Sequence, residues 1–299
     1  MFGDKTTCRV CTIFLWVFFV GFVSTTGATA QEPARVYFRL HSRDIIEKHL
    51  KSFSDRNGER EVRIRTWLAE AGCANSNLSE QPIGRKFIPN VICVLPGESP
   101  DVIVVGAHTD HVEDFGDGVV DNWTGAVLLP SLLYSLNANA RRHTFIFIGF
   151  SGEERGLLGS SYYADHLNKA ERAKVKAMVN FDSLGLGPTK VWASHADKAL
   201  MDPLTVAGAA SHLPLGAVNV ESVGASTDSE SFARYHIPRI TLHSITTQTY
   251  PILHSSSDRL AAIKMNDYYD SYKLIAEYLA YLDLMLRTEI PAVTPKPMQ

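Results

Sequence analysis

The chain has 299 residues, of which 45% are apolar and 20% are charged, so it can bury a full hydrophobic core. That length suits one large α/β domain or two small ones. The formal net charge of −3 and the isoelectric point of about 6.4 exclude the basic surface typical of nucleic-acid-binding proteins, and we expect no nucleic-acid partner.

The first 30 residues have the layout of a secretory signal peptide. Lys5 and Arg9 precede an uninterrupted apolar run at residues 13–23, and a small-x-small site follows at residues 28–30. The alternative is a membrane anchor, but such a run would span only about half of the hydrocarbon core of a bilayer. We predict that residues 1–30 are removed and that the mature protein is exported, either to the periplasm or to the medium, with no stable membrane anchor.

Two of the four cysteines remain after this cleavage. Cys8 and Cys11 lie in the segment that is removed, whereas Cys73 and Cys93 lie in the mature chain. In an oxidising compartment the remaining pair is able to form a disulfide, although two buried thiols explain the sequence equally well.

The mature chain begins with two predicted helices, at residues 42–52 and 59–71. The first has Ile45, Ile46 and Leu50 on its apolar face, and the second is stopped by Gly72. Between the two helices, Asn57-Gly58 predicts a turn.

Two strands are predicted next, at residues 87–95 and 102–107. They are joined by residues 96–100, Pro-Gly-Glu-Ser-Pro, a turn-rich link that suits an antiparallel pair.

From residue 122 onward, predicted helices and strands alternate. In chain order they are a helix at 122–136, a strand at 144–150, a helix at 157–167, a strand at 177–181, a helix at 198–210, strands at 217–220 and 239–242, and a long helix at 266–286. This alternation predicts an α/β fold, a three-layer sandwich with a mixed, mostly parallel central sheet. No linker rich in Pro, Gly and Ser divides the chain, so we predict one domain at residues 31–290 and a disordered tail at residues 291–299.

Acidic and histidine side chains fall where the predicted strands end. One buried strand is followed by Glu153 and Glu154, and another by His108 and Asp110. Because the carboxyl ends of parallel strands form one rim of a sheet, where α/β proteins keep their ligand sites, we expect these side chains to lie close together.

Other candidate residues are weak signals individually. Asp121 precedes a helix, where a simple N-cap would explain it, Asp182 ends a strand, and His254 lies in a polar loop that closes with Asp258. Together with His108 and the two glutamates they form a mixed nitrogen and oxygen ligand set, which suits zinc with an open coordination position.

Six motifs contain these residues. They are, in chain order, GAHTDH at 106–111, VVDNWTGA at 119–126, FSGEERGLLGS at 150–160, NFDSLG at 180–185, STDSESF at 226–232 and LHSSSD at 253–258. The set resembles the M28 family of co-catalytic zinc aminopeptidases, in its compact exported bacterial form. It covers nearly the whole mature core in the order expected for that family.

The resemblance implies two zinc ions per chain and a role for each ligand. Asp121 would bridge the two ions, His108 and Asp182 would complete one site, and Glu154 and His254 would complete the other. The implied substrates are peptides with a free N-terminus.

The resemblance also implies roles for residues that do not bind metal. Glu153 would be the general base, Asp110 would orient His108, and Asp258 would help to hold the ligands in place without contacting the metal ions.

Four residues differ from the family pattern or are left open by it. Thr227 and Ser229, which flank Asp228, stand where the family often has Ser and His. Tyr250 is near the loop in which some relatives carry a tyrosine that stabilises the tetrahedral intermediate. Trp123 is bulky for its position beside Asp121 and either packs under the helix or narrows the pocket.

Two other hypotheses compete with the peptidase. One is a glutaminyl cyclase, an acyltransferase that resembles the same fold but uses a single zinc ion. The other is a binding module without catalytic activity. The complete set of five ligands and the GEERGLLGS segment favour the peptidase, and the presence of Glu153 argues against the binding module, because only catalysis requires a general base.

Overall fold

The structure is a computed structural model of the chain, and it describes residues 36–219 and 226–286. The predicted signal peptide, the predicted tail and both boundaries of the predicted domain lie outside the described residues.

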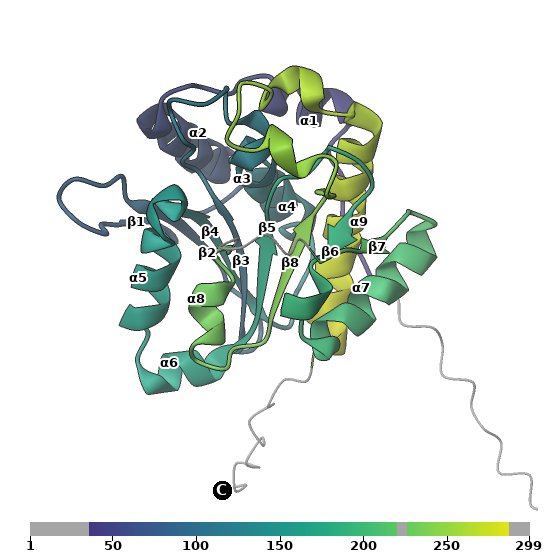
Figure 1. The fold of residues 1–299 in the computed structure, drawn as a ribbon. Helices are drawn as coiled ribbons and strands as arrows, with labels where there is room; N and C mark the ends of the chain where they lie inside the picture. The colour runs from purple at the N-terminus through teal and green to yellow at the C-terminus, as the bar shows by residue number, and fades with distance from the viewer. Residues whose placement is uncertain (1–35, 220–225, 287–299) are drawn as a thin grey trace, which may run out of the picture. The chain divides into compact units, whose positions relative to one another are not determined.

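Within the described chain, eight strands form a single sheet (Figure 1). The strands are β1 Leu78–Gln81, β2 Asn90–Leu95, β3 Val102–His108, β4 Thr144–Phe150, β5 Val175–Phe181, β6 Lys190–Val191, β7 Gly216–Ala217 and β8 Arg239–His243. Their order across the sheet is β1-β2-β4-β3-β5-β8-β6-β7. The central strands β4, β3, β5 and β8 are parallel, whereas β2 and β6 run antiparallel to their central neighbours. The predicted mixed, mostly parallel sheet is therefore confirmed.

Helices cover both faces of this sheet. They are α1 Arg43–Leu50, α2 Asn57–Glu70, α3 Thr124–Ala126, α4 Leu128–Leu136, α5 Leu158–His166, α6 Lys169–Lys174, α7 Lys198–Ser211, α8 Glu230–Ala233 and α9 Met265–Met285. Helices α1, α2, α4, α7 and α9 contribute to one hydrophobic core, and α5 and α8 contribute to a second core on the other face (Figure 1). This arrangement confirms the predicted three layers.

Strand β3 shows why the sheet carries two cores. Successive side chains of a strand point to opposite faces. Ile103 and Val105 therefore belong to the larger core, while Val104 packs into the smaller one with Tyr163 of α5 and Phe232 of α8. Burial on both faces explains the nearly continuous apolar sequence of the central strands.

The predicted pairing of the strands at 87–95 and 102–107 is wrong. β4 lies between β2 and β3, antiparallel to the first and parallel to the second. The link at residues 96–100 does not close a hairpin, because its backbone is bound by the segment before β4: the N–H groups of Glu98 and Ser99 donate to the carbonyls of Arg141 and Arg142. The turn residues at 96–100 are compatible with a hairpin and also with a connection between strands that are not neighbours. The pairing of strands distant in sequence decides between the two.

The turn predicted at Asn57-Gly58 is instead the beginning of α2. The side chain of Asn57 is bound by a distant loop: its Oδ1 accepts from the N–H of His111 at 3.0 Å, and its Nδ2 donates to the carbonyl of that residue at 3.2 Å. This tertiary contact places the residue at the helix start. On the preceding helix, Ile46 is buried as predicted, whereas Ile45 is 37% exposed.

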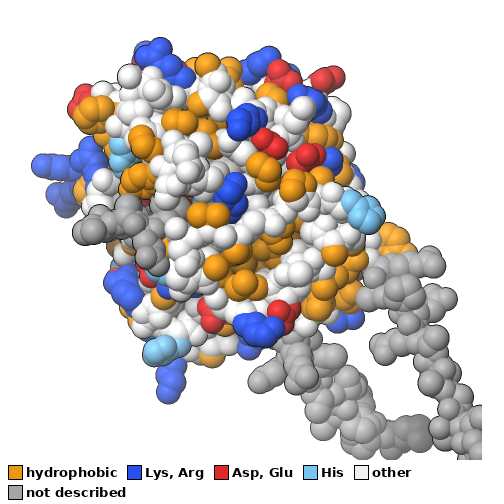
Figure 2. Space-filling view, turned by 45° about the vertical axis from the view of Figure 1, so that its right-hand side comes forward, with side chains coloured by type: hydrophobic (Ala, Val, Ile, Leu, Met, Phe, Trp, Pro, Cys, Tyr) orange, Lys and Arg blue, Asp and Glu red, His pale blue; other side chains and the backbone are white. Residues whose placement is uncertain are grey.

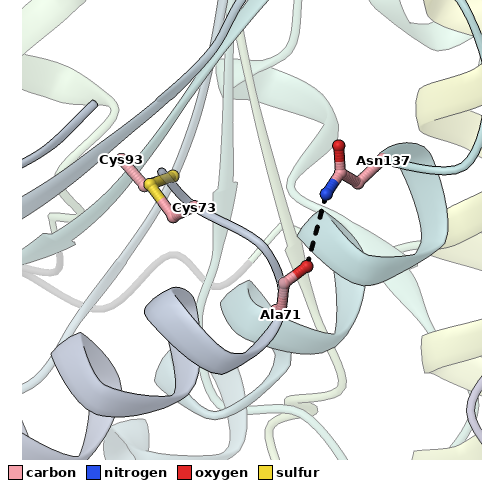
Figure 3. Close-up of a disulfide and its surroundings, with 4 residues drawn as sticks. All are labelled: Ala71, Cys73, Cys93 and Asn137. Carbon is pink, nitrogen blue, oxygen red and sulfur yellow. Dashed lines mark hydrogen bonds between the residues drawn. A yellow bond between two sulfur atoms is a disulfide. The ribbon is translucent and has the colours of Figure 1, made fainter. Parts of the chain in front are cut away.

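Cys73 and Cys93 form a disulfide that joins the end of α2 to β2 (Figure 3). Their Cα atoms are 6.1 Å apart, within the usual range for a disulfide. Close by, Nδ2 of Asn137 donates to the carbonyl of Ala71 at 3.4 Å, which ties the same end of α2 to the end of α4.

We expect the double variant Cys73→Ala/Cys93→Ala to lose about 3 kcal/mol of the free energy of unfolding, because the bridge restricts the unfolded chain. The bridged residues are 20 apart in sequence, which sets this magnitude. Urea unfolding of both proteins without reductant would measure the difference. With reductant the two proteins should unfold at similar urea concentrations; equal stability without reductant would contradict the prediction.

On the face shown in Figure 2, side chains of both charges are interspersed with apolar ones. This mixture agrees with the small net charge of the chain. Among the helices that the structure describes, none combines the length and the apolar character needed to cross a membrane.

Candidate metal centre

The predicted ligands come together at the carboxyl ends of the central strands. His108 is the last residue of β3, Glu153 and Glu154 follow β4, Asp182 follows β5, and His254 lies in the loop after β8. Because β4, β3, β5 and β8 are neighbours in the sheet, these ends form one rim.

Asp121 presents its two carboxylate oxygens to two different groups. Its Oδ1 is 3.1 Å from Nε2 of His108, and the same nitrogen is 3.7 Å from Oδ1 of Asp182. Its Oδ2 is 3.2 Å from Nε2 of His254, and that nitrogen is 2.9 Å from Oε2 of Glu154. Within each group the ligand atoms lie within 4.8 Å of one another. One carboxylate is thus shared by two histidine-containing groups.

The residues present fit zinc. Nδ1 of His108 lies 3.0 Å from the backbone carbonyl of Asp110 and donates to it, so Nε2, which faces the carboxylates, would be the nitrogen that binds a metal ion. Oε1 of Glu154 is buried and has no hydrogen-bond partner in the described structure. A buried carboxylate oxygen without a partner is costly, and a metal ion would satisfy it.

The pKa values of the predicted ligands are shifted by burial and by the charges of their neighbours. Burial would raise the pKa of Asp121, but hydrogen bonds with His108 and His254 hold it well below its usual range. Hydrogen bonds to Asp121 and Glu154 raise the pKa of His254 to about 11. Burial would lower the pKa of His108, but Glu153 and the acidic ligands raise it well above its usual value. The Asp121 carboxylate is therefore stabilised by nearby positive charge, which a bound cation would also supply, whereas burial raises the pKa values of Glu154 and Asp182.

Glu153 lies beside these predicted ligands, and its surroundings favour the protonated form of its carboxyl group. Burial, reinforced by Asp228 and other acids and opposed by His108, raises the pKa of Glu153 well above its usual value. One of its carboxylate oxygens lies within 4.8 Å of ligand atoms of both His108 and Glu154. A carboxyl group in this position is able to hold a proton close to His108 and to Glu154, which belong to different predicted metal-binding groups.

Asp110 fixes the pair of glutamates. Its Oδ1 accepts from the N–H of Glu153 at 3.1 Å and its Oδ2 from the N–H of Glu154 at 3.3 Å. The Asp110 carboxylate is 3.8 Å from Nδ1 of His108, which lies closer to the backbone carbonyl of Asp110. Asp110 therefore contacts His108 through its main chain and the glutamates through its side chain.

Asp258 fixes the backbone that carries Asp121. Its Oδ1 accepts from the N–H of Val120 at 2.6 Å, and its Oδ2 accepts from the N–H of Asp121 at 3.1 Å. Asp258 is buried, and burial raises its pKa to about 7.

A cavity of about 530 Å³ adjoins the ligands. Four acids, Asp121, Glu153, Glu154 and Asp182, line one part of it. Apolar and aromatic surface comes from Trp192, Ile245, Tyr250, Pro251 and Leu253, and the remaining lining is largely polar, with Ser183, Thr227 and His243 among it. Such a combination of apolar surface with polar groups is typical of a site for a small ligand or for one residue of a peptide.

The structure settles the position of Trp123. It is fully buried, and its Nε1 donates to the carbonyl of Leu50 at 3.1 Å. Trp123 is not among the residues that line the cavity. Of the two interpretations of its sequence position, packing under the helix is the one that the structure supports.

Two buried charged residues near the site have no role in the sequence predictions. Asp228 is fully buried with no hydrogen-bond partner for either oxygen among the described residues, and burial raises its pKa to about 7. Its neighbours Thr227 and Ser229 bond to each other instead, at 3.0 Å. The STDSESF motif marks this position in the sequence. Arg60, in α2, has no such motif, and only its three-dimensional contacts identify it.

Part of the chain matches a known protein family, peptidase family M28, whose sequence model covers residues 90–279. Among curated proteins, the chain is similar to probable leucine aminopeptidase 2 of Aspergillus oryzae, with 35% identity over 121 residues. That match covers 39% of this chain and 24% of the relative. It is also similar to aminopeptidase YwaD of Bacillus subtilis, with 30% identity over 194 residues, 57% of this chain and 41% of the relative. The chain therefore matches less than half the length of either relative.

Solved structures share the fold. BSAP, a zinc aminopeptidase from Bacillus subtilis, superposes with a TM-score of 0.58 at 23% identity over 64% of this chain and 49% of that chain. A glutaminyl cyclase from Porphyromonas gingivalis superposes with a TM-score of 0.63 at 17% identity over 82% of this chain and 97% of that chain. At these identities the likeness concerns the fold, which both reaction classes use.

Proposed function

The chain belongs to peptidase family M28, and from this premise we propose that it is an aminopeptidase with two zinc ions that releases N-terminal residues from peptides. The observation that carries the proposal is the placement of Asp121, whose oxygens face two separate groups. A carboxylate in this position is able to bridge two metal ions of a hydrolytic site.

Each ion would be held by three side chains. His108 and Asp182 would hold one ion, Glu154 and His254 the other, and Asp121 both. When bound, the ions would activate a water molecule and polarise the scissile carbonyl group.

Glu153 belongs to neither set of ligands in this proposal and would transfer the proton. Its carboxylate would accept a proton from the attacking water and later donate it to the leaving amine. Its position supports this role, because one of its carboxylate oxygens lies within 4.8 Å of ligand atoms of both His108 and Glu154. The hydrogen bond from its N–H to the Asp110 side chain fixes its main chain next to the segment that follows β3.

The cavity would receive the N-terminal residue of the peptide. Its acidic part attracts the positively charged α-amino group, and its apolar part, including Trp192 and Leu253, has room for a side chain. A free N-terminus is therefore the feature of the substrate that the site would recognise.

Metal content and reporter assays test the proposal together. We expect two zinc ions per purified chain and release of N-terminal residues from aminoacyl reporter substrates, with loss of activity on chelation and recovery when zinc is restored. One zinc ion per chain and cyclisation of an N-terminal glutamine would instead identify a glutaminyl cyclase. A chain without metal and without either activity would be a binding module.

A further inference from the structure

Helix α2 places a fully buried arginine, Arg60, next to the metal centre. Arg60 lies outside residues 90–279, the part of the chain that the family model covers. Because a guanidinium group is rarely buried without partners, the groups that it binds indicate what it does.

All three nitrogens of the Arg60 guanidinium donate to backbone carbonyls. Nε donates to the carbonyl of Ser54 at 2.6 Å, Nη1 donates to that of Gly118 at 3.0 Å, and Nη2 donates to that of Asp117. The guanidinium carbon is also 5.6 Å from the ring centre of Trp123. Arg60 therefore joins the start of α2 to the loop that immediately precedes Asp121.

Asp258 binds the same loop through the complementary backbone groups. Its carboxylate accepts from the N–H groups of Val120 and Asp121, and its backbone carbonyl accepts from the N–H of Asp117 at 2.8 Å. Arg60 thus holds carbonyls of the loop while Asp258 holds amides. Charge-assisted bonds of this kind are about twice as strong as neutral ones.

The glycines of the loop leave it little freedom. Gly118 has a φ of +55°, and a Cβ there would lie 2.4 Å from Cβ of His111. Gly116 has a φ of +69°, and a Cβ there would lie 2.4 Å from the carbonyl of Ser255. Only glycine combines this backbone conformation with such close contacts, so the loop is packed in one conformation.

Arg60 also stays charged in this environment. Burial lowers its pKa to about 10, and the carboxylates of Asp258, Asp110 and Asp121 oppose that shift. At neutral pH the guanidinium is therefore protonated, and all its bonds to the loop are charge-assisted.

We propose that Arg60 is a positioning residue of the metal centre, which holds the carbonyls of Asp117 and Gly118 so that Asp121 faces both metal positions before an ion binds. This inference rests on the proposed zinc function. A ligand that is already in place loses little conformational freedom on binding, so a loosened loop would weaken zinc binding without removing a ligand.

Zinc titration of the metal-free protein against a chromophoric chelator tests this inference. Arg60→Lys keeps the charge but lacks the planar fork that reaches several carbonyls, and we expect about tenfold weaker zinc binding. Arg60→Met should weaken it by up to about 100-fold. The matched control is Arg63→Met, because Arg63 lies on the same helix and donates to the carbonyl of Ser52, not to the loop. The control should bind zinc as the wild type does.

Thermal unfolding of each metal-free variant separates positioning from stability. A wild-type zinc dissociation constant in Arg60→Lys would overturn the inference even if that variant were less stable. If Arg60→Met does not fold, the measurement on Arg60→Lys alone decides. A wild-type chain that binds no zinc would overturn the proposed function together with the inference. Two zinc ions in the wild type and unchanged binding in Arg60→Lys would overturn the inference only.

Discussion

Replacing Glu153 by alanine is expected to lower kcat by about 10²–10⁴-fold while both zinc ions stay bound. The reason is that Glu153 is in neither of the two groups that Asp121 joins, so its removal leaves every proposed ligand in place. What is lost is the carboxyl group that accepts and returns the proton. The measurements are kcat on an aminoacyl reporter and the zinc content of the same preparation.

Two further variants make the result specific to Glu153. Glu153→Gln keeps the size of the side chain but not its proton affinity, and should be as inactive as the alanine variant. Glu113→Gln removes an exposed acid from the loop after β3 and should retain wild-type activity. Ordinary turnover in Glu153→Gln would contradict the assignment of the base, and loss of zinc would show that Glu153 is a ligand.

The position of the site was predictable because strand ends are visible in the sequence. The apolar run of β4 ends at Phe150 and that of β5 at Phe181, so Glu153, Glu154 and Asp182 could be placed at the carboxyl ends of strands from local pattern alone. Parallel strands then bring these ends to one rim, whichever strands are neighbours. Predicting that these residues share one rim therefore required only the direction of each strand.

Strand pairing and the support of the site depend on contacts between distant residues. The position of β4 between β2 and β3 follows from pairing across more than forty residues, for example Val91 with Gly149. Arg60 binds carbonyls 57 and 58 residues away, and backbone carbonyls carry no signature in the sequence. The short elements β1, β6 and α6 were also missed, because so few residues show no periodicity.

Replacing Asp121 by alanine is expected to remove both zinc ions together. Its two oxygens lie in different groups, so the substitution leaves only His108 and Asp182 for one ion and His254 and Glu154 for the other. Residues that merely touch a ligand change metal affinity by about 10–100-fold, and loss of a shared ligand should exceed that range for both ions. Zinc titration of the metal-free variant measures the number of ions and their dissociation constants.

Asp182→Ala is the matched comparison, since Asp182 belongs to the His108 group only. It should weaken one ion strongly and leave the second near its wild-type affinity, whereas Asp121→Ala should give no tight site. Circular dichroism of both variants checks that they are folded, which we expect because Asp258 binds the main chain and not the side chain of Asp121. Two tightly bound zinc ions in Asp121→Ala would contradict the shared role. Equal losses in the two variants would show that the sites are coupled by more than this one carboxylate.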